Sequence, residues 1–138
     1  MSEVGDSSSN IVDSRKHMDL LFSKAKDKIL DAEDITVFTH TDCDGITAGS
    51  ILSSIFDKLE IDHSVNFVDI NEVENLTTDT DLTIISDLGA GQNVSNICDN
   101  SNKSVIVLDH HPPIRKLGTK LKGNLIEINP NYYGLDGS

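Results

Sequence analysis

The sequence predicts an α/β fold in which a parallel β-sheet is flanked by helices. Two observations support this prediction. Short, continuous apolar runs alternate along the chain with segments of helical periodicity, an order typical of buried parallel strands joined by helices. Several of the apolar runs also end abruptly in acidic residues or histidines. In a parallel sheet the carboxyl ends of the strands share one edge, where ligands bind.

The N-terminal region is expected to contain a disordered leader followed by a long helix. Residues 1–13 are rich in serine and acidic residues, and segments of this kind bury too little apolar surface to fold alone. A helix is predicted from Asp13 or Ser14 to about Leu30, because apolar residues recur at helical spacing. The residues of this apolar stripe are Met18, Leu21, Phe22, Ala25 and Ile29. We expect the stripe to be a packing face.

Five apolar runs are the predicted strands. They cover residues 35–40, 64–68, 82–86, 104–108 and 125–128. Two further helices are predicted between them, at about residues 46–59 and 94–99. Residues 14–138 are thus expected to form one domain, which suits a chain of 138 residues.

The composition argues against several classes of protein. With 23 acidic and 11 basic residues the net charge is −12, so the broad basic surface of a passive DNA-binding module is missing. The two cysteines are too far apart for a zinc motif. No apolar run approaches the roughly 18 residues of a membrane span. The N-terminus lacks the basic start and apolar stretch of a secretory signal, which favours a cytoplasmic protein.

Three of the predicted strand ends carry potential metal ligands. They are His40, Asp42 and Asp44 after the first strand, Asp87 after the third, and Asp109, His110 and His111 after the fourth. Carboxylates gathered at one sheet edge would repel one another, and two divalent cations would remove that conflict. Oxygen and nitrogen ligands suit Mn²⁺ better than ions that prefer thiolates. The pattern therefore predicts a two-metal site.

The spacing of these residues indicates different tasks for them. Asp42 and Asp44 are alternate residues of a loop, so each carboxylate can reach a different metal. Asp87 stands alone and can bridge two cations through its two oxygens. His110 can supply a neutral nitrogen, while His111 points elsewhere and can meet the substrate. Each motif alone is a weak signal, but all three at strand ends in this order are hard to explain as accident.

The same residues resemble the motifs of the DHH phosphoesterase family. The triplet at residues 109–111 (DHH), directly after an apolar strand, resembles the motif that gives the family its name. Residues 40–45 (HTDCDG) and 86–89 (SDLG) resemble the first and second motifs of the family. The resemblance extends over residues 14–138, and residues 128–138 (INPNYYGLDGS) are most similar to the archaeal RecJ-like branch.

This resemblance implies a role for each residue of the site. The implied metal ligands are His40 with Asp42 for one ion and Asp44 with His110 for the other, with Asp87 bridging both. Asp109 is implied to orient this set by hydrogen bonding, and His111 to contact the scissile phosphate. The implied cofactor is two Mn²⁺ ions, with Mg²⁺ as the alternative, and the implied reaction is two-metal hydrolysis.

The implied activity is that of a RecJ-like exonuclease on single-stranded DNA or RNA, with replication or repair proteins as partners and no membrane. A basic cluster follows the DHH triplet and contains Arg115, Lys116, Lys120 and Lys122. It is either a solvated loop or a contact for the phosphate backbone, and we assign that contact to Arg115 and Lys116. Tyr132 and Tyr133 either stack on a base or pack internally. His17 and His63 are expected to be surface residues.

Two features depart from the family pattern. The family's DHH domain supplies a further metal-binding Asp from a later strand, whereas the late acidic residue of this chain, Asp136, is expected to lie in a turn. The C-terminal substrate domain of the family is absent from these 138 residues. The DHH domain is therefore expected to be incomplete at its C-terminal end, which puts activity of this chain alone in doubt.

Alternative functions stay open at this point. One is a phosphodiesterase for short oligonucleotides or cyclic dinucleotides. Pyrophosphate is a lower-ranked substrate, because pyrophosphatases of this type have a longer His-to-Asp spacing in the first motif than that between His40 and Asp42. Another is a non-catalytic scaffold of a replication complex derived from this family. Such scaffolds have lost their metal ligands, so the retained early motifs favour an enzyme.

Overall fold

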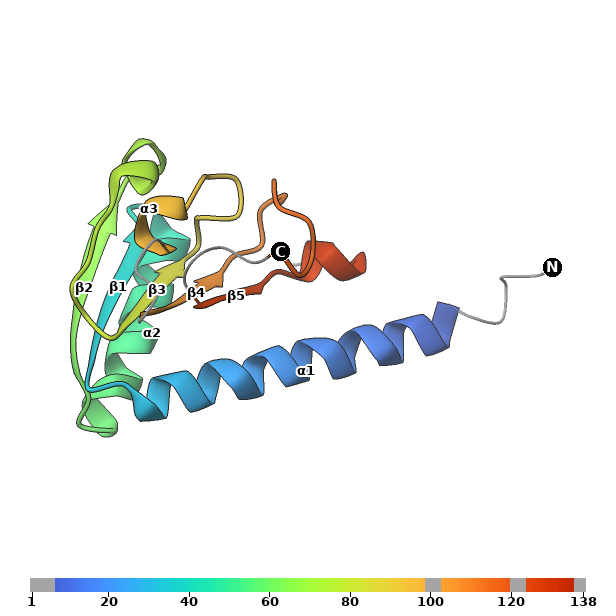
Figure 1. Ribbon diagram of the computed structural model, residues 1–138, viewed down its shortest axis with the longest axis horizontal. Coiled ribbons are helices and arrows are strands. Elements are labelled where there is room, and N and C mark those ends of the chain that lie inside the picture. Colours follow the sequence, from blue (N-terminus) through green and yellow to red (C-terminus); the bar gives the residue numbers. More distant parts are fainter. Residues whose placement is uncertain (1–6, 99–102, 120–123, 136–138) are drawn as a thin grey trace.

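A sheet of five parallel strands organises the computed structural model, which describes residues 7–98, 103–119 and 124–135. The strands are β1 (Asp34–His40), β2 (Asp62–Val68), β3 (Leu82–Ser86), β4 (Ser104–Leu108) and β5 (Asn124–Ile128). Their order across the sheet is β2-β1-β3-β4-β5, and every neighbouring pair is parallel (Figure 1). The predicted α/β class and the five predicted strands are confirmed.

Helices cover both faces of this sheet. They are the α-helices α1 (Ser7–Asp31), α2 (Cys43–Lys58) and α3 (Ser95–Cys98), and the 3₁₀-helices η1 (Ile70–Asn75) and η2 (Pro130–Tyr133). Helices α1 and α2 pack on one face of the sheet, and η1 and α3 pack on the other. The sheet is therefore the middle layer of the fold, as the continuous apolar strands predict.

Successive residues of the central strands point to opposite faces and enter two separate cores. Ile84 of β3 and Ile106 of β4 pack with Phe56 beneath α1 and α2. Their neighbours Ile85 and Val107 pack beneath η1 and α3. All five side chains are fully buried. Because both faces are covered, neither face of β3 meets water, and this explains why its sequence is a nearly unbroken apolar run.

Helix α1 begins at Ser7, earlier than the predicted start at Asp13 or Ser14. The predicted leader therefore overlaps the helix over residues 7–13, while residues 1–6 lie outside the described part of the chain. The cause is the cooperativity of helices: once the packed turns have formed, each further residue adds a hydrogen bond at small entropic cost, so a polar segment can extend the helix.

Most of the predicted apolar stripe of α1 packs on the sheet. Met18, Leu21, Ala25 and Ile29 contact the core that α1 shares with α2. Phe22 lies at one edge of the stripe, and 50% of its surface is exposed. The stripe is thus a packing face, as expected, although it is narrower than its sequence spacing indicates.

The connections of β1 place a topological switch point in the middle of the sheet. The chain leaves β1 through α2 on one face towards β2, and it leaves β3 through α3 on the other face towards β4. From the carboxyl ends of β1 and β3 the chain therefore turns away in opposite directions. In open α/β sheets this is the position at which ligands bind.

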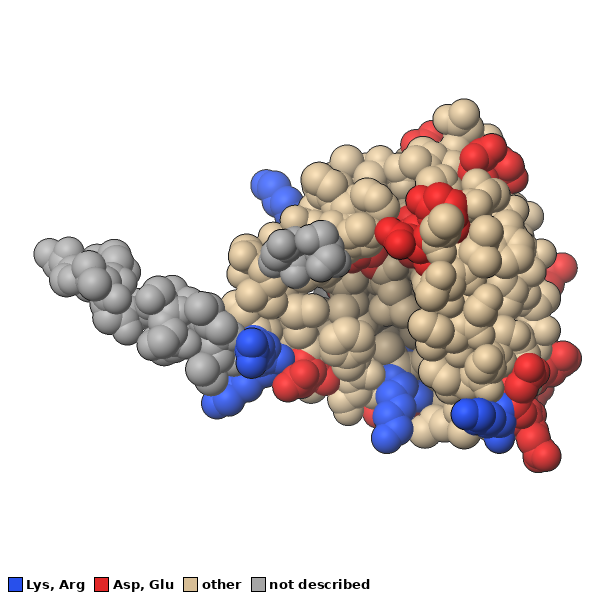
Figure 2. All heavy atoms as spheres, turned by 180° about the vertical axis from the view of Figure 1, so that it is seen from behind, with Lys and Arg blue, Asp and Glu red and all other residues tan. Residues whose placement is uncertain are grey.

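Charged residues are distributed unevenly over the surface. Five of the 11 Lys and Arg residues lie on α1, namely Arg15, Lys16, Lys24, Lys26 and Lys28. In Figure 2 the basic side chains lie mainly along the lower margin, on the side where α1 runs, whereas acidic side chains gather on the right. Among the described residues, no helix has the length and apolar character needed to cross a bilayer.

We expect that truncating a residue of the core beneath α1 and α2 destabilises the fold strongly. Replacing the fully buried Ile84 with Ala should lower the free energy of unfolding by about 2–5 kcal/mol, because the methyl groups leave a cavity. Urea denaturation followed by circular dichroism measures this change. The control is Ile51→Ala on α2, where 57% of the residue is exposed, and its effect should stay within about 0.5 kcal/mol. Similar losses for both variants would contradict the described packing.

Candidate metal centre

The first part of the site is the turn that joins β1 to α2. Asp42 is the N-cap of α2, and its Oδ1 accepts a hydrogen bond of 2.9 Å from the Gly45 backbone N–H. The Nδ1 atom of His40 lies 3.0 Å from Oδ2 of Asp42. Gly45 is required because a Cβ there would lie 2.6 Å from the carbonyl carbon of His40, and still closer to its oxygen. The tight turn thus sets the two side chains side by side.

The electrostatics of this turn favour the ionised carboxylate of Asp42. The hydrogen bond from the Gly45 backbone lowers the pKa of Asp42, and this effect together with Asp87 and His40 outweighs the opposing effect of desolvation. Helix α2 begins at Cys43, earlier than the predicted start at about residue 46, so Asp42 caps the helix and does not lie in an extended loop.

Asp87 directly follows β3 and has an unusual conformation. Its φ is 62°, in the left-handed region that few residues other than glycine adopt. The residue is 7% exposed. Its Oδ1 lies 3.1 Å from Nε2 of His110, while its buried Oδ2 accepts no hydrogen bond from any described residue. Strained backbone and an unsatisfied buried oxygen both carry a free-energy cost, and such features concentrate at functional sites.

The environment of Asp87 disfavours its charge. Burial raises the pKa of this carboxyl, and the neighbouring Asp42 raises it further, although His110 acts in the opposite direction. The carboxylates of Asp42 and Asp87 therefore lie together at the switch point, and one oxygen of Asp87 has no hydrogen-bond partner among the described residues. A bound cation would relieve both the repulsion and the missing hydrogen bond.

Asp109, by contrast, has hydrogen-bond partners on both oxygens. Its Oδ1 lies 2.6 Å from Nδ1 of His111 and accepts from the His110 backbone N–H at 2.8 Å. Its Oδ2 accepts from the Ala90 backbone N–H at 3.0 Å. The buried carboxylate thus joins the loop after β3 to the loop after β4 and orients the His111 ring. This geometry suits the orienting task that the family resemblance implies for Asp109.

The histidines of the triplet remain partly accessible. Their side chains are 34% exposed for His110 and 50% exposed for His111, and their ring centroids lie 4.4 Å apart. Burial works against protonation of His111, but the hydrogen bond to Asp109 and the negative charges of Asp109, Asp87 and Asp42 outweigh it and raise the pKa of His111.

The residues of the predicted metal site, apart from Asp44, come together in two overlapping groups that could hold a metal ion. One group contains His40, Asp42 and Asp87, and the other contains Asp87, Asp109, His110 and His111. Within each group the candidate ligand atoms lie within 4.8 Å of one another. Asp87 belongs to both groups, and its predicted role as a bridging ligand stays a prediction. The donors are carboxylate oxygens and imidazole nitrogens, a set that fits divalent ions such as Mn²⁺ or Mg²⁺.

Asp44 stands apart from both groups. It lies in the first turn of α2, where a carboxylate also interacts favourably with the helix dipole. It nevertheless lines the same open depression at the sheet edge as Asp87, Asp109 and His110. Its predicted pairing with His110 around a second metal stays a prediction.

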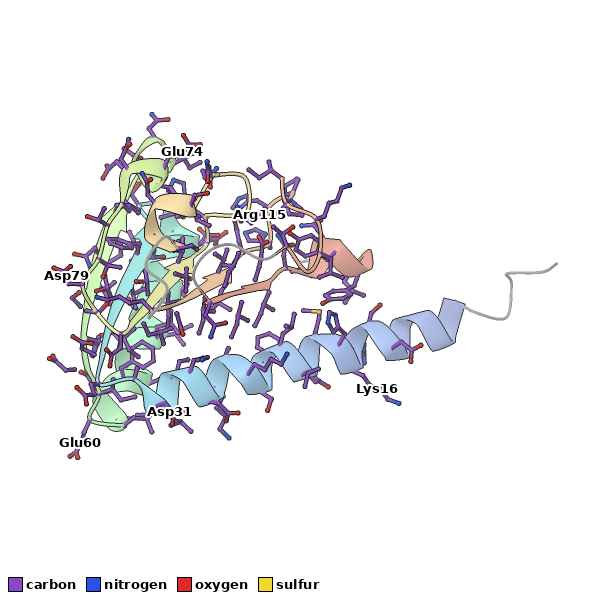
Figure 3. The ribbon with its side chains drawn as sticks, in the orientation of Figure 1. Lys16, Asp31, Glu60, Glu74, Asp79 and Arg115 are labelled. Atoms are coloured by element: carbon purple, nitrogen blue, oxygen red, sulfur yellow. The ribbon has the colours of Figure 1, made fainter. Side chains whose placement is uncertain are left out.

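Arg115 occupies a different environment from the one expected for a substrate contact. Its guanidinium makes a two-pronged ion pair with Glu127, with Nε–Oε1 at 3.0 Å and Nη2–Oε2 at 2.9 Å. It also donates to the backbone carbonyls of Gln92 and Gly89, at 2.7 and 2.6 Å. The two charged side chains are only 8% and 9% exposed. Because its donors are directed at protein acceptors, Arg115 ties the loop after β3 to β5 (Figure 3).

The other residues predicted to contact substrate are Lys116 and the two tyrosines. Lys116 lines a groove of about 720 Å³ between α1 and β5, away from the ligand groups. The hydroxyl of Tyr132 donates to Glu127, at 2.7 Å, and the hydroxyl of Tyr133 lies 2.6 Å from Nδ1 of His17. Internal packing thus accounts for both tyrosines. Lys120, Lys122 and Asp136 lie outside the described residues.

His17 and His63, expected to be surface residues rather than ligands, are half-buried and belong to neither ligand group. His17 contacts Tyr133 edge to face. The His63 side chain is 10% exposed and lies 2.9 Å from both the Ser53 hydroxyl and the Ile61 carbonyl. Their partners are distant in the sequence or lie across a turn, so the sequence pattern around each histidine does not indicate them.

Two polar residues beside the site are not indicated by the sequence motifs. Asn129 and Asn131 follow β5 and donate hydrogen bonds to the backbone carbonyls of His111 and His110. Asparagine next to proline is ordinarily a turn residue, so neither was singled out. Their place at another strand end, on the edge that carries the ligands, is the signal that identifies them.

Comparison with known proteins places these features in a family. Residues 34–132 match the family model described as "DHH family, N-terminal domain". An uncharacterized protein of Methanocaldococcus jannaschii is 34% identical over 131 residues, which cover 89% of this chain and 30% of that relative.

Solved structures resemble this fold as well. RecJ of Thermus thermophilus in complex with Mn²⁺ matches with a TM-score of 0.54 and 25% identity, over 86% of this chain and 17% of that chain. A structure of exonuclease RecJ bound to manganese matches with a TM-score of 0.54 and 22% identity, over 86% of this chain and 31% of that chain. This chain therefore spans less than a third of each of these relatives.

Replacing Asp87 with Asn is expected to remove metal binding without weakening the metal-free fold. Because the pKa of Asp87 is raised in the folded state, its ionisation destabilises the metal-free protein increasingly as the pH rises through that raised pKa. The neutral amide has the same shape, so the Tm at neutral pH should stay equal or increase. Wild type should gain about 2.7 kcal/mol at a Mn²⁺ concentration of 100 times Kd.

Thermal unfolding with and without Mn²⁺ measures both effects. The variant should show no Mn²⁺-dependent increase in Tm. A full increase in Asp87→Asn would show that Asp87 is not a ligand, and a large loss of metal-free stability would show that its charge serves the fold.

Replacing Arg115 with Met is expected to destabilise the fold rather than affect substrate alone. The change leaves the Glu127 carboxylate buried without its partner, which should lower the free energy of unfolding by about 3–5 kcal/mol. The matched control is Lys116→Met, which removes the neighbouring exposed charge and should leave stability within about 0.5 kcal/mol. Wild-type stability of Arg115→Met would contradict the structural assignment and restore the phosphate-contact hypothesis.

Proposed function

The chain belongs to the DHH family, and on that premise we propose that it forms the metal-binding part of a metal-dependent phosphodiester hydrolase acting on nucleic acid. The observation that carries this proposal is the pair of ligand groups that share Asp87 at the switch point. Asp87 presents a buried oxygen without a hydrogen-bond partner to this region. A fold that needed only stability would gain by replacing such a group.

The proposed cofactor is a pair of divalent ions, with Mn²⁺ preferred and Mg²⁺ as the alternative. His40 and Asp42 would hold one ion, His110 and Asp44 the other, and Asp87 would bridge them. The Mn²⁺ in the Thermus thermophilus RecJ structure supports the choice of ion. Bound ions of this kind polarise phosphate oxygens and lower the pKa of bound water. The assignment of Asp44 rests on its place in the same depression.

The residues of this chain have complementary tasks in the proposed reaction. The Asp109 carboxylate lies against Nδ1 of His111, and the ring is half exposed, so Nε2 is left for a partner outside this pair. The raised pKa of His111 favours a protonated ring that can donate Nε2–H to a phosphate oxygen. Asp109 thereby sets the orientation of His111 and stabilises its positive charge.

Single-stranded DNA or RNA is the proposed substrate, cleaved by a RecJ-like exonuclease. The names of both similar structures, which are RecJ proteins, support this choice. The accessible imidazoles and the open depression also suit a polymer better than a fully enclosed small molecule. Because the net charge is −12, we expect the bound cations rather than a basic surface to meet the phosphates.

We expect the wild-type chain to bind Mn²⁺, and hydrolysis of a 5′-labelled single-stranded oligonucleotide tests whether these residues suffice for activity. Titration calorimetry measures the binding, and denaturing electrophoresis follows the products. His111→Ala should keep Mn²⁺ affinity within a few-fold and reduce the hydrolysis rate by about 10²–10³-fold, because one donor to the phosphate is lost.

Parallel assays with duplex DNA, a cyclic dinucleotide and pyrophosphate separate the alternatives. Faster cleavage of the cyclic dinucleotide would replace the exonuclease proposal with a small-molecule phosphodiesterase. Failure to bind Mn²⁺ would overturn the metal site and favour the non-catalytic scaffold.

A further inference from the structure

The backbone on either side of His111 lies outside the regular sheet. The last backbone hydrogen bond of this strand edge runs from the Asp109 N–H to the Ile128 carbonyl, at 3.3 Å. Beyond it the chain leaves β4, so the carbonyls of His110 and His111 no longer have a neighbouring strand as donor. Carbonyls at such a position need another partner.

Two asparagines supply these partners. The Nδ2 atom of Asn131 donates to the His110 carbonyl at 2.6 Å, and Nδ2 of Asn129 donates to the His111 carbonyl at 2.7 Å. The asparagines are themselves connected, because Oδ1 of Asn129 accepts from the backbone N–H of Asn131 at 2.9 Å and from its Nδ2 at 3.0 Å. Asn129 is fully buried and is the N-cap of η2.

This arrangement holds the conformation of one residue in particular. The His110 carbonyl belongs to the rigid peptide plane before the Cα of His111, and the His111 carbonyl belongs to the plane after it. Fixing both planes fixes φ and ψ of His111. Pro112 adds a further restriction, because a residue before proline is confined to extended conformations.

The side chains show why this backbone needs support. Successive residues of a regular strand point to opposite sides, whereas the rings of His110 and His111 lie close together, with centroids 4.4 Å apart. The backbone must therefore depart from strand geometry here. Asp109 holds only Nδ1 of the His111 ring. The backbone at the Cα of His111, from which the side chain extends, must therefore be held by other residues.

Resting on the proposed function, we propose that Asn129 and Asn131 are positioning residues that lock the backbone of His111 and thereby aim its imidazole at the reacting phosphate. The asparagine pair holds the main chain while Asp109 holds the ring. Together they leave His111 with one orientation, in which Asp109 holds Nδ1 and the half-exposed ring keeps Nε2 for another partner. The η2 turn, which extends beyond β5, is thus part of the site.

Asn131 is the residue to substitute, because it is exposed while Asn129 is buried. Asn131→Ala removes the amide, and Asn131→Asp keeps its shape but replaces the N–H donor with an oxygen that repels the carbonyl. The matched control is Asn96→Asp: Asn96 is also exposed and donates Nδ2 to the Glu74 carbonyl at 2.5 Å, far from the ligand groups.

The primary readout is the ring ¹⁵N spectrum of the metal-free protein. Both Asn131 variants should shift or broaden the His111 signals, while the His63 signals stay in place and Asn96→Asp resembles wild type. In the oligonucleotide assay, kcat should fall by about 10²-fold with KM within a few-fold of wild type, as expected when a reacting group is misplaced by about 1 Å. Tm should change by only a few degrees.

The two proposals fail in different ways. Unchanged His111 signals in both Asn131 variants would overturn the positioning role, whatever the activity. The same would follow if Asn131→Asp matched wild type, because the donor would then be dispensable. If wild type neither bound Mn²⁺ nor cleaved the oligonucleotide, the proposed function would fail, while the spectra of the metal-free protein would still decide whether the asparagines hold His111.

Discussion

Negative charge gathers at one edge of the buried sheet, and the surrounding loops and helix ends are arranged to compensate it. Asp42 and Asp109 are each compensated by the protein, the first by the start of α2 and the second by backbone N–H groups and His111. Asp87 is not compensated in the same way, since one of its buried oxygens has no described donor. The edge therefore carries a local deficit of positive charge at the switch point, and a cation is the simplest group to supply it.

The strands and strand-end residues could be predicted from the sequence because short segments of the chain determine them. An apolar run followed by an acidic residue identifies both a strand and its end, and the strand ends of a parallel sheet necessarily share one edge. This reasoning is enough to bring His40, Asp42, Asp87 and the DHH triplet together, as the structure does. Their individual roles as ligands are not decided by proximity. Asp44 illustrates this limit, because its place in the first turn of α2 also has a purely helical explanation.

The parts that the sequence could not predict depend on partners far away in the chain. Arg115 looked like a phosphate contact because it follows the triplet in a basic segment, yet its partner Glu127 lies on β5. His17 meets Tyr133 across 116 positions. The chemistry of a side chain shows which groups it can bind, whereas only the folded structure shows which group it contacts. A charged or hydrogen-bonding side chain whose groups are bound to other protein groups has a structural role, and one whose groups stay accessible can have a functional role.

The strand order has a consequence for how the site comes into being. Its ligand groups come from the ends of β1, β3 and β4, and the asparagine supports follow β5, so the contributing segments run from residue 40 to residue 131. No short stretch emerging during synthesis holds a finished set of ligands, because β1 and β3 pair only after the chain has passed through β2 and η1. Contacts of such long sequence separation require loop closure before they form, and folds built on them fold slowly. A cation bound at this centre would thus stabilise the pairing of the whole sheet rather than any single segment of the chain.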